Sequence, residues 1–419
     1  MYWSELTTGI YPWDVHDEGI ETILDNLQEH AGCNAAYMVA LMHHEKRPLH
    51  DNYYFHNPVR KRYLAEDSRA YWSIHPDMYK DSRIKPLTSD RDFLKGTDWL
   101  DVFIKGLRSR GMKTGAEISH TPLDAHRGRH EFYDCIQKDV YGNPPDRGLK
   151  TFQQLCWNSP DAKAYMRSLA ADLATHYDLD VIQTCTILMN PGRPDLHPFL
   201  GVTLGGCFCG NCEREARRAG LDWNLMKQTV RYYADVMTGA TLESLEDRLL
   251  IKRGDSTETM FMLEKPELFA WLKFRTVSIT NYFREVGEAI HAVNPNIDFR
   301  FNTCWPDMVG NGQDLTRIAD YVNSVRLMDY SEQTGDEKLV LDKGTWIANV
   351  RRQVGEEKPI IAAIAPRAKA TPDLIKKGIR AVKLAGADGL SFGFYDGATI
   401  ERLKAIKEGM QELEVQLKI

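Results

Sequence analysis

Three cysteines lie within six residues near the middle of the chain, in the segment GGCFCGNCEREARRAG. The spacing C-x-C-x-x-C can direct Cys207, Cys209 and Cys212 at one tetrahedral metal ion and leaves the fourth ligand to another part of the chain. Cys156, in the segment QLCWNSPDAKAYM, is the candidate for that ligand. Unligated loop thiols and a redox motif are the alternatives, whereas a disulfide framework is unfavourable in a long chain without a secretion signal.

Two carboxylates end predicted strands that are otherwise small or apolar. Glu117 ends the segment KTGAE and Asp329 ends SVRLMD, where an unpaired carboxylate is costly unless function retains it. Glycoside cleavage needs one carboxyl group to protonate the leaving oxygen and a second to stabilise the developing positive charge. We therefore predict that Glu117 and Asp329 form a catalytic pair, with Glu117 as the acid and Asp329 as the nucleophile or base. Asp396 is the substitute for either.

Aromatic and polar residues that follow the predicted strands suit a carbohydrate cleft. Carboxylates hydrogen-bond sugar hydroxyls, and flat aromatic rings stack on the apolar faces of sugar rings. For any single residue the alternative is packing or capping, and Asp14, for example, could cap the helix that follows it. The predicted substrate-binding residues are Trp13, Asp14, His43, His44, His120, Asn302, Trp305, Tyr330, Arg367, Tyr395 and Asp396.

The elements that must position these residues form a regular series. Short apolar segments alternate with amphipathic helical segments along the whole sequence, which is the pattern of β-α-β units. Eight strands are the number that closes a (β/α)8 TIM barrel, whereas an open doubly wound sheet would need a glycine-rich turn after the first strand. The predicted strands are Glu5–Ile10, Ala35–Met42, Lys113–Ile118, Val181–Leu188, Asp298–Asn302, Ser324–Met328, Ile360–Ala365 and Gly389–Phe394.

Three of the predicted connections, those after strands two, three and four, are much longer than the few residues usual after a barrel strand. They are loop insertions at about 43–96, 117–159 and 190–264, within a single barrel domain over residues 1–419. All three follow the C-terminal ends of strands, and in barrel enzymes that face carries the active site. We therefore expect the substrate cleft on that face.

One part of the sequence, roughly residues 151–220, resembles a known family. A cysteine before an Asn-Ser-Pro step, a long helix, a Y-x-x-D approach to strand four and then C-x-C-x-x-C are similar to the catalytic barrel of family 42 β-galactosidases and their uncharacterised glycoside-hydrolase-like relatives. The resemblance implies a structural zinc held by Cys156, Cys207, Cys209 and Cys212. That family ends strand four with an Asn-Glu pair whose Glu is the acid/base, whereas this chain has VIQTCTILMN there and no carboxylate.

The leading prediction is therefore a glycosidase for a small saccharide, and two other functions fit parts of the residue set. His43, His44, Glu117 and His120 could bind a divalent metal ion at the strand ends, as a sugar isomerase, epimerase or lyase requires. The missing strand-four glutamate motivates a third interpretation, a barrel that binds carbohydrate without cleaving it.

Composition limits the partners. The 59 acidic and 53 basic side chains give a net charge of −6, so no overall positive field attracts nucleic acid or an anionic membrane. The sequence begins without a basic leader or an apolar signal segment, and no apolar run approaches the length of a membrane span. We expect a cytoplasmic enzyme, unless a signal peptide has been removed, with a saccharide or glycoside as partner and neither nucleic acid nor membrane. Assembly as a homo-oligomer is left open.

Overall fold

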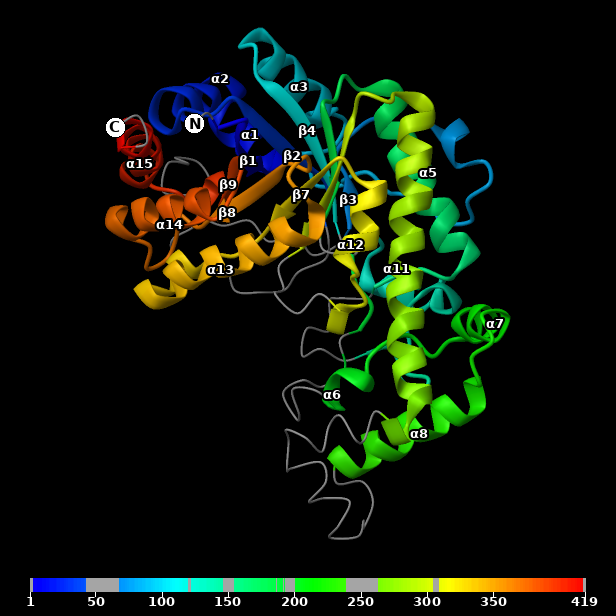
Figure 1. Ribbon diagram of the computed structural model, residues 1–419. Helices are drawn as coiled ribbons and strands as arrows, with labels where there is room; N and C mark the ends of the chain where they lie inside the picture. Colours follow the sequence, from blue (N-terminus) through cyan, green and yellow to red (C-terminus); the bar gives the residue numbers. More distant parts are fainter. Residues whose placement is uncertain are drawn as a thin grey trace.

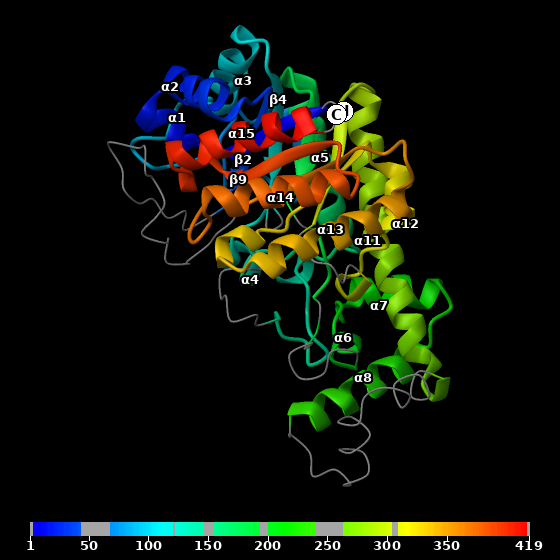
Figure 2. The same ribbon diagram turned by 60° about the vertical axis from the view of Figure 1, so that its left-hand side comes forward.

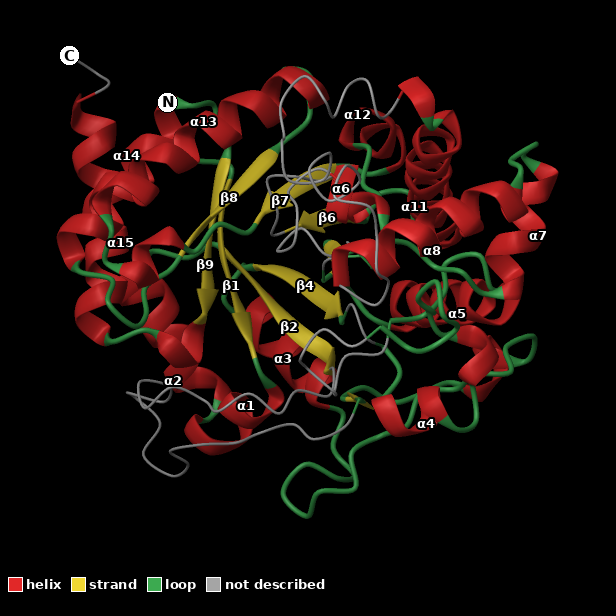
Figure 3. Ribbon diagram, turned by 90° about the horizontal axis from the view of Figure 1, so that it is seen from below, coloured by secondary structure: helices red, strands yellow, loops and turns green. Residues whose placement is uncertain are grey.

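Eight parallel strands close into a barrel in the computed structural model, because β1 pairs with both β9 and β2. The model describes residues 3–42, 68–119, 122–145, 154–185, 187–190, 192, 200–238, 263–303 and 309–416. The predicted (β/α)8 architecture is thus confirmed, and helices surround the strands (Figure 3). The barrel strands are β1 (Glu5–Ile10), β2 (Ala35–Met42), β4 (Lys113–Ile118), β5 (Val181–Thr184), β6 (Asp298–Thr303), β7 (Ser324–Leu327), β8 (Ile360–Ile364) and β9 (Gly389–Phe394).

The fourth barrel strand is shorter than predicted. The sequence predicts a strand over Val181–Leu188, but β5 ends at Thr184. The amide of Cys185 still donates to the carbonyl of Ile118 on β4 at 2.8 Å. Farther along, the carbonyl of Leu188 accepts from Gln137 Nε2 at 3.0 Å, and the amide of Met189 donates to the carbonyl of Asn311 at 3.0 Å. These partners outside the sheet satisfy backbone groups that a longer strand would otherwise pair.

The helices form two groups around the barrel. The last three, α13 (Glu337–Val354), α14 (Pro372–Leu384) and α15 (Ile400–Gln416), lie side by side along one side (Figure 2). On another side, α5 (Pro160–His176) packs against the long helix α11 (Pro266–Val293) (Figure 1). The remaining helices of the barrel wall are α1 (Pro12–Glu18), α2 (Ile20–Asp25) with a π-helix at Asn26–Ala31, α3 (Trp99–Ser109) and α12 (Leu315–Ile318).

Local sequence sets where several of these helices begin. Ser159 and Thr371 accept hydrogen bonds from backbone amides in the first turns of α5 and α14, and a proline follows each cap. This combination of a hydroxyl cap and a proline at the first helical position is strongly favoured at helix starts. None of the helices in the described part of the chain is both long enough and apolar enough to cross a membrane.

The long connections carry additional elements. The two-residue strand β3 (Arg69–Ala70) pairs antiparallel with β2, and α4 (Ala125–Arg129) follows β4. The connection after β5 contains α6 (Leu200–Thr203), α7 (Gly210–Arg218) and α8 (Trp223–Thr238), and α11 extends away from the barrel toward them (Figure 1). The single-domain boundary and the limits of the insertions stay predictions.

Polar side chains reach across the barrel interior. Arg300 on β6 donates to both carboxylate oxygens of Glu5 on β1, at 2.7 and 2.9 Å, although these strands are not neighbours in the sheet. Arg326 on β7 donates to Ser391 on β9 at 2.9 Å in the same way. Asn302 pairs in register with Arg326, so the Arg326 level lies nearer the C-terminal ends of the strands than the Arg300 level. The barrel interior therefore has two polar levels.

Candidate functional site

Glu117 lies buried near the C-terminal end of β4, with partners from two other strands. Gln183 on β5 donates from Nε2 to Glu117 Oε2 at 2.6 Å, and Asn302 on β6 donates from Nδ2 to the same oxygen at 3.4 Å. A guanidinium nitrogen of Arg326 is 4.0 Å from that oxygen. These donors stabilise negative charge on Oε2 and fix its position.

Arg326 connects this carboxylate to the rest of the upper barrel level. It donates to Asn302 Oδ1 at 3.2 Å, to Ser391 Oγ at 2.9 Å and to the hydroxyl of Tyr330 at 3.3 Å. Its guanidinium carbon lies 5.2 Å from the ring centroid of Tyr37, within the range of a cation–π contact. We call the following residues the Arg326 network: Tyr37, Glu117, Gln183, Asn302, Arg326, Tyr330 and Ser391.

Four of the predicted site residues are brought together by this network. Glu117, Asn302 and Tyr330 belong to it, and the guanidinium of Arg367 lies 5.0 Å from the ring centroid of Tyr330. Arg367 also donates to Gln333 at 3.1 Å. The result is a polar, cationic level of guanidinium, amide and hydroxyl groups near the C-terminal ends of the strands.

A second group of predicted residues gathers after β1 and β9. Asp14 is fully buried in the first turn of α1, and its Oδ2 accepts the backbone amide of Tyr11, the residue that precedes the helix, at 2.9 Å. Its other oxygen has no hydrogen-bond partner among the described residues. Burial, the negative charge of Asp396 and other nearby carboxylates raise the pKa of Asp14 well above its usual value. Asp14 can therefore hold a proton at a pH where an exposed aspartate cannot.

Two further members of this group, Trp13 and Tyr395, make packing contacts and hydrogen bonds. Trp13 is buried and stacks on Tyr11, with ring centroids 4.4 Å apart. The hydroxyl of Tyr395 donates to Glu18 at 2.8 Å and accepts from Asn26 at 2.7 Å. The 3₁₀ helix Tyr395–Gly397, which includes Asp396, is thereby joined to α1 and to the first residue of the π-helix.

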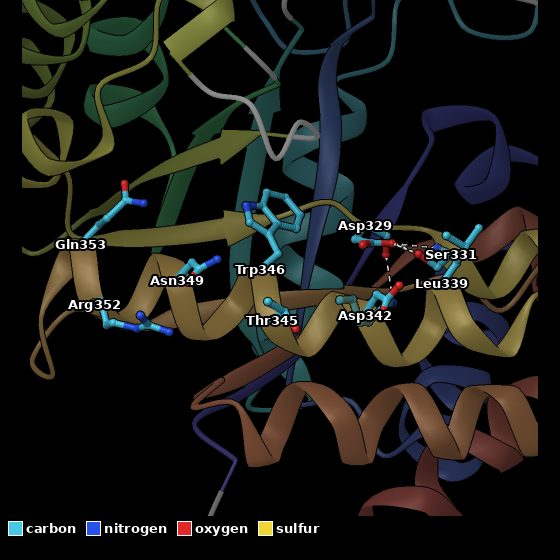
Figure 4. A pocket seen from close by; sticks show the side chains of 10 residues that line it. Asp329, Ser331, Leu339, Asp342, Thr345, Trp346, Asn349, Arg352 and Gln353 are labelled. Carbon is cyan, nitrogen blue, oxygen red and sulfur yellow. Dashed lines mark hydrogen bonds between the residues drawn. The ribbon is translucent and has the colours of Figure 1, made fainter. Parts of the chain in front are cut away.

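Asp329 lies in a different environment from Glu117. Its Oδ1 accepts the backbone amide of Ser331 at 2.9 Å and also the Ser331 hydroxyl. Figure 4 shows Asp329 and Ser331 beside α13, where they line a pocket of about 740 Å³ with Trp346 and Asn349. Glu117 and Asp329 share no hydrogen-bond partner among the contacts described above. Their pairing stays a prediction.

Four predicted residues lie outside the described residues. They are His43, His44, His120 and Trp305. The metal-site alternative rests on three of them, so it stays untested.

Sequence reasoning overlooked much of the Arg326 network, namely Tyr37, Gln183, Arg326 and Ser391. One signal was present: Arg300 and Asn302, and likewise Ser324 and Arg326, alternate with apolar residues in two strands of a parallel barrel. With period two, such residues face one side of the sheet, here the interior. A charged residue in that pattern indicates an interior partner.

The four predicted cysteines converge as expected. The Sγ atoms of Cys156, Cys207, Cys209 and Cys212 are buried and lie within 4.8 Å of one another. Hydrogen bonds from the other three thiols hold the pKa of Cys209 well below its usual range, whereas thiol contacts and burial raise the pKa of Cys156. This donor set fits a tetrahedral thiophilic cation, since sulfurs about 2.3 Å from such an ion lie about 3.8 Å apart.

Hydrogen bonds and close packing surround the cysteines. Asn158 donates from Nδ2 to Cys212 Sγ at 3.3 Å and to Ser278 on α11 at 3.0 Å. Gly206 has a φ of +108°, and a Cβ atom there would lie 2.3 Å from the Trp271 ring. Only glycine permits this close approach, which seats the cysteine loop against α11.

Comparisons with known proteins give a result at the level of the fold. No family model matches the sequence, and no curated protein matches it. Among solved structures, the chain is similar to an α-L-fucosidase from Paenibacillus thiaminolyticus, with a TM-score of 0.58, 13% identity, and coverage of 100% of this chain and 50% of that one. A β-galactosidase from Bacillus circulans sp. alkalophilus gives a TM-score of 0.58 and 14% identity, covering 98% and 56%.

A third structure, a GH42 β-galactosidase named Gan42B, has a TM-score of 0.58 and 12% identity, covering 98% of this chain and 56% of that one. The chain thus spans about half the length of these structures. The resemblance to family 42 β-galactosidases is confirmed for the barrel fold.

Proposed function

We propose that this chain is a glycoside hydrolase that acts on a small saccharide through carboxyl groups at the C-terminal end of the barrel. The observation that carries the proposal is the environment of Glu117, a buried carboxylate whose Oε2 accepts side-chain hydrogen bonds from two other barrel strands. Its fixed position suits a group that must meet one carbon atom of a bound sugar. The fold likeness to a fucosidase and to β-galactosidases supports this reaction class.

We assign Glu117 the role of the charged carboxylate, reversing the sequence-based assignment. Gln183, Asn302 and the nearby guanidinium of Arg326 stabilise its negative charge. A carboxylate that stays ionised can attack the anomeric carbon or stabilise its developing positive charge, whereas a general acid must keep its proton.

The proton donor in this proposal is the pair of Asp14 and Asp396. Both side chains are buried, and they repel each other electrostatically when ionised. Two neighbouring carboxyl groups in a low-dielectric site retain a shared proton, which a general acid requires. Asp329 is the competing donor, because the sequence predicts it as the partner of Glu117.

A panel of aryl glycosides, including galactosides and fucosides, tests the reaction class. We expect turnover of at least one of them, and Asp396→Asn should lower kcat by about 10²–10⁴-fold, as loss of a general acid does. Asp329→Asn is the matched control and should keep near-normal turnover. A large loss in Asp329→Asn with none in Asp396→Asn would instead support the sequence-based pair. If saccharides bind and none of them is cleaved, the chain is a carbohydrate-binding protein and not a glycosidase.

Azide tests the role of Glu117. In Glu117→Ala the missing carboxylate leaves space for a small anion, which can attack the anomeric carbon in its place. We expect azide to restore part of the lost turnover and to yield a glycosyl azide whose anomeric configuration is inverted relative to the substrate, because azide attacks from the side of the missing carboxylate. Absence of rescue and of the azide product would contradict the assignment.

We also propose that the four cysteines hold a structural zinc ion, which would tie the loop before α7 to the segment before α5. The zinc would have no open coordination position and no part in the chemistry. Elemental analysis of reduced protein should give one zinc per chain, and Cys209→Ser should abolish it. Cys33→Ser, at a buried cysteine outside the cluster, should leave the zinc content unchanged. Zinc-free wild-type protein with normal thermal stability would contradict this proposal.

A further inference from the structure

A buried carboxylate with two imidazoles joins α5 to the segment before α3. Asp172 on α5 is fully buried, and its Oδ1 lies 2.8 Å from Nδ1 of His75 and 3.0 Å from Nδ1 of His176. The cluster shares no residue with the Arg326 network or with the cysteine site. Neither the proposed glycosidase chemistry nor the proposed zinc uses it.

The two oxygens of Asp172 have different surroundings. Oδ2 accepts the indole nitrogen of Trp72 and the hydroxyl of Tyr79, both at 3.0 Å. These two neutral donors hold the carboxylate in one orientation and leave Oδ1 facing the imidazoles. In metal sites, a coordinating carboxylate is typically held in position by hydrogen bonds from groups that do not touch the metal. Trp72 and Tyr79 hold Asp172 in this way.

The imidazoles can be reached from solvent. The side chains of His75 and His176 are 36% and 30% exposed, whereas Asp172 is at 0%. Their rings stack with centroids 3.4 Å apart and an interplanar angle of 10°. His176 follows Asp172 by one helical turn, so α5 supplies two members of the cluster from one face. An ion could thus reach the cluster from solvent and keep water molecules as ligands on its exposed side.

We propose that His75, Asp172 and His176 form a binding site for a divalent first-row transition-metal ion. Nitrogen and oxygen ligands about 2.1 Å from such an ion lie about 3 Å apart when they occupy adjacent octahedral positions. The observed separations of 2.8 and 3.0 Å between the Nδ1 atoms and Oδ1 agree with that spacing. Two imidazoles and one carboxylate on one face of the ion form a donor set that zinc, nickel, copper and iron accept.

Binding requires a change in the two histidines and has a structural effect. Each Nδ1 must present its lone pair to the ion instead of a hydrogen to the Asp172 carboxylate or, for His176, to the Asp172 backbone carbonyl at 3.1 Å, so the proton moves to Nε2 or leaves. Because the stacked rings lie in nearly parallel planes, one ring must also rotate so that both lone pairs point at the ion. The ion would then clamp the segment of residues 72–79 to the C-terminal half of α5. That clamp ties the connection after β2 to the barrel wall.

Nickel titration by calorimetry tests the site. His126 and His130, four residues apart with ring centroids 4.5 Å from each other, are a second pair that can take the same ion. Every protein in the comparison therefore carries His126→Ala and His130→Ala, and its zinc content is measured before and after titration. The parent protein carries only His126→Ala and His130→Ala. We expect it to bind one more nickel equivalent than the variant that also carries His176→Ala, and we expect His75→Ala to weaken that binding at least tenfold. Equal stoichiometry and Kd in parent and His176→Ala would overturn the proposal.

Two further measurements separate metal binding from a purely structural role. Tyr79→Phe keeps all three ligands and removes one outer hydrogen bond, so we expect nickel affinity to fall by about tenfold. Crystals soaked in nickel should show an anomalous peak between His75, His176 and Asp172. If His176→Ala lowers Tm while nickel binding and the anomalous map show no ion here, the cluster is a hydrogen-bonded joint and the proposal is wrong.

Discussion

Two buried arginines on neighbouring strands of one barrel have different electrostatic surroundings. Arg300 donates to carboxylates of Glu5 and Asp298, at 2.7 to 2.9 Å, and to Ser324 at 2.8 Å. The hydrogen bonds that Arg326 donates to described residues go to uncharged groups, and the carboxylate of Glu117 lies 4.0 Å away. We call Glu5, Asp298, Arg300 and Ser324 the Arg300 network.

The difference separates a structural role from a candidate functional one. A buried guanidinium costs several kcal/mol of desolvation unless carboxylates compensate it, and the Arg300 network supplies that compensation. The Arg326 network, nearer the C-terminal ends of the strands, leaves its cation less closely paired. Incomplete pairing of this kind favours binding of polar or developing charges, as catalytic sites require. Substitutions in the two networks should therefore affect different properties.

The largest expected effect is on turnover. Glu117→Gln removes a charge in the Arg326 network, so kcat should fall by about 10³-fold while the free energy of unfolding changes little, because amide hydrogen bonds can persist. Glu5→Gln is the matched control in the Arg300 network. Its folded fraction should keep near-normal kcat. Similar turnover losses in the two variants would remove the functional distinction between the networks.

The second effect is on stability. Glu5→Gln leaves Arg300 short of a buried partner and should lower the free energy of unfolding by about 3–5 kcal/mol, measured by denaturant titration. The double variant Glu5→Leu with Arg300→Met removes both charges and should recover part of that loss. If Glu5→Gln lowers the free energy of unfolding by less than about 1 kcal/mol, the ion pair between Glu5 and Arg300 does not stabilise the barrel.

The pH dependence of stability gives a further test of the Arg300 network. Burial would raise the pKa of Glu5, but the charge and hydrogen bonds of Arg300 hold it below its usual 4.5. Because the folded state binds protons less readily, the stabilisation is present above pH 4.5 and is lost as the pH falls through the folded pKa. Acid unfolding of Glu5→Gln should accordingly show a weaker pH dependence than that of the wild type.

A smaller loss is expected at Ser391. Ser391→Ala removes the acceptor of Arg326 Nε, found at 2.9 Å, and leaves a buried donor unpaired. The expected cost is about 1–3 kcal/mol of unfolding free energy. Ser324→Ala removes the matching acceptor of Arg300 and serves as the control, since two carboxylates still bind that arginine. A larger loss of unfolding free energy in Ser324→Ala than in Ser391→Ala, measured by denaturant titration, would contradict this difference between the two networks.

The smallest expected effect is a change in how steeply stability depends on pH near Asp14. Burial and Asp396 raise the pKa of Asp14 above its usual 3.8, so the folded state keeps a proton that the unfolded state releases. Stability must therefore fall as the pH rises from about 3.8 through the folded pKa, opposite to the trend for Glu5. The Tm of Asp14→Asn relative to wild type should rise over that window. A constant Tm difference between the two proteins would contradict a shared proton.

The sequence predicted the barrel because strand periodicity and helix caps are local signals. Four of the predicted strands, including those at Glu5–Ile10 and Lys113–Ile118, have the observed bounds. β5 was overestimated because its exit depends on a distant partner, Gln137. The cysteine site could be predicted from the sequence because three of its four members lie in one short motif. Four members of the Arg326 network were not predicted, because the network joins residues from Tyr37 to Ser391 that meet only when the barrel closes.

Barrel closure also has a consequence for the order of events during synthesis. Thr8 on β1 donates to the carbonyl of Phe392 on β9, a partner 384 residues later in the chain. At 5–20 residues per second a ribosome needs about 20–80 s to produce that partner. Throughout this interval β1 lacks one of its two neighbours, and the edge it exposes can pair with other chains. Nascent chains should therefore depend on chaperones until the last strand emerges.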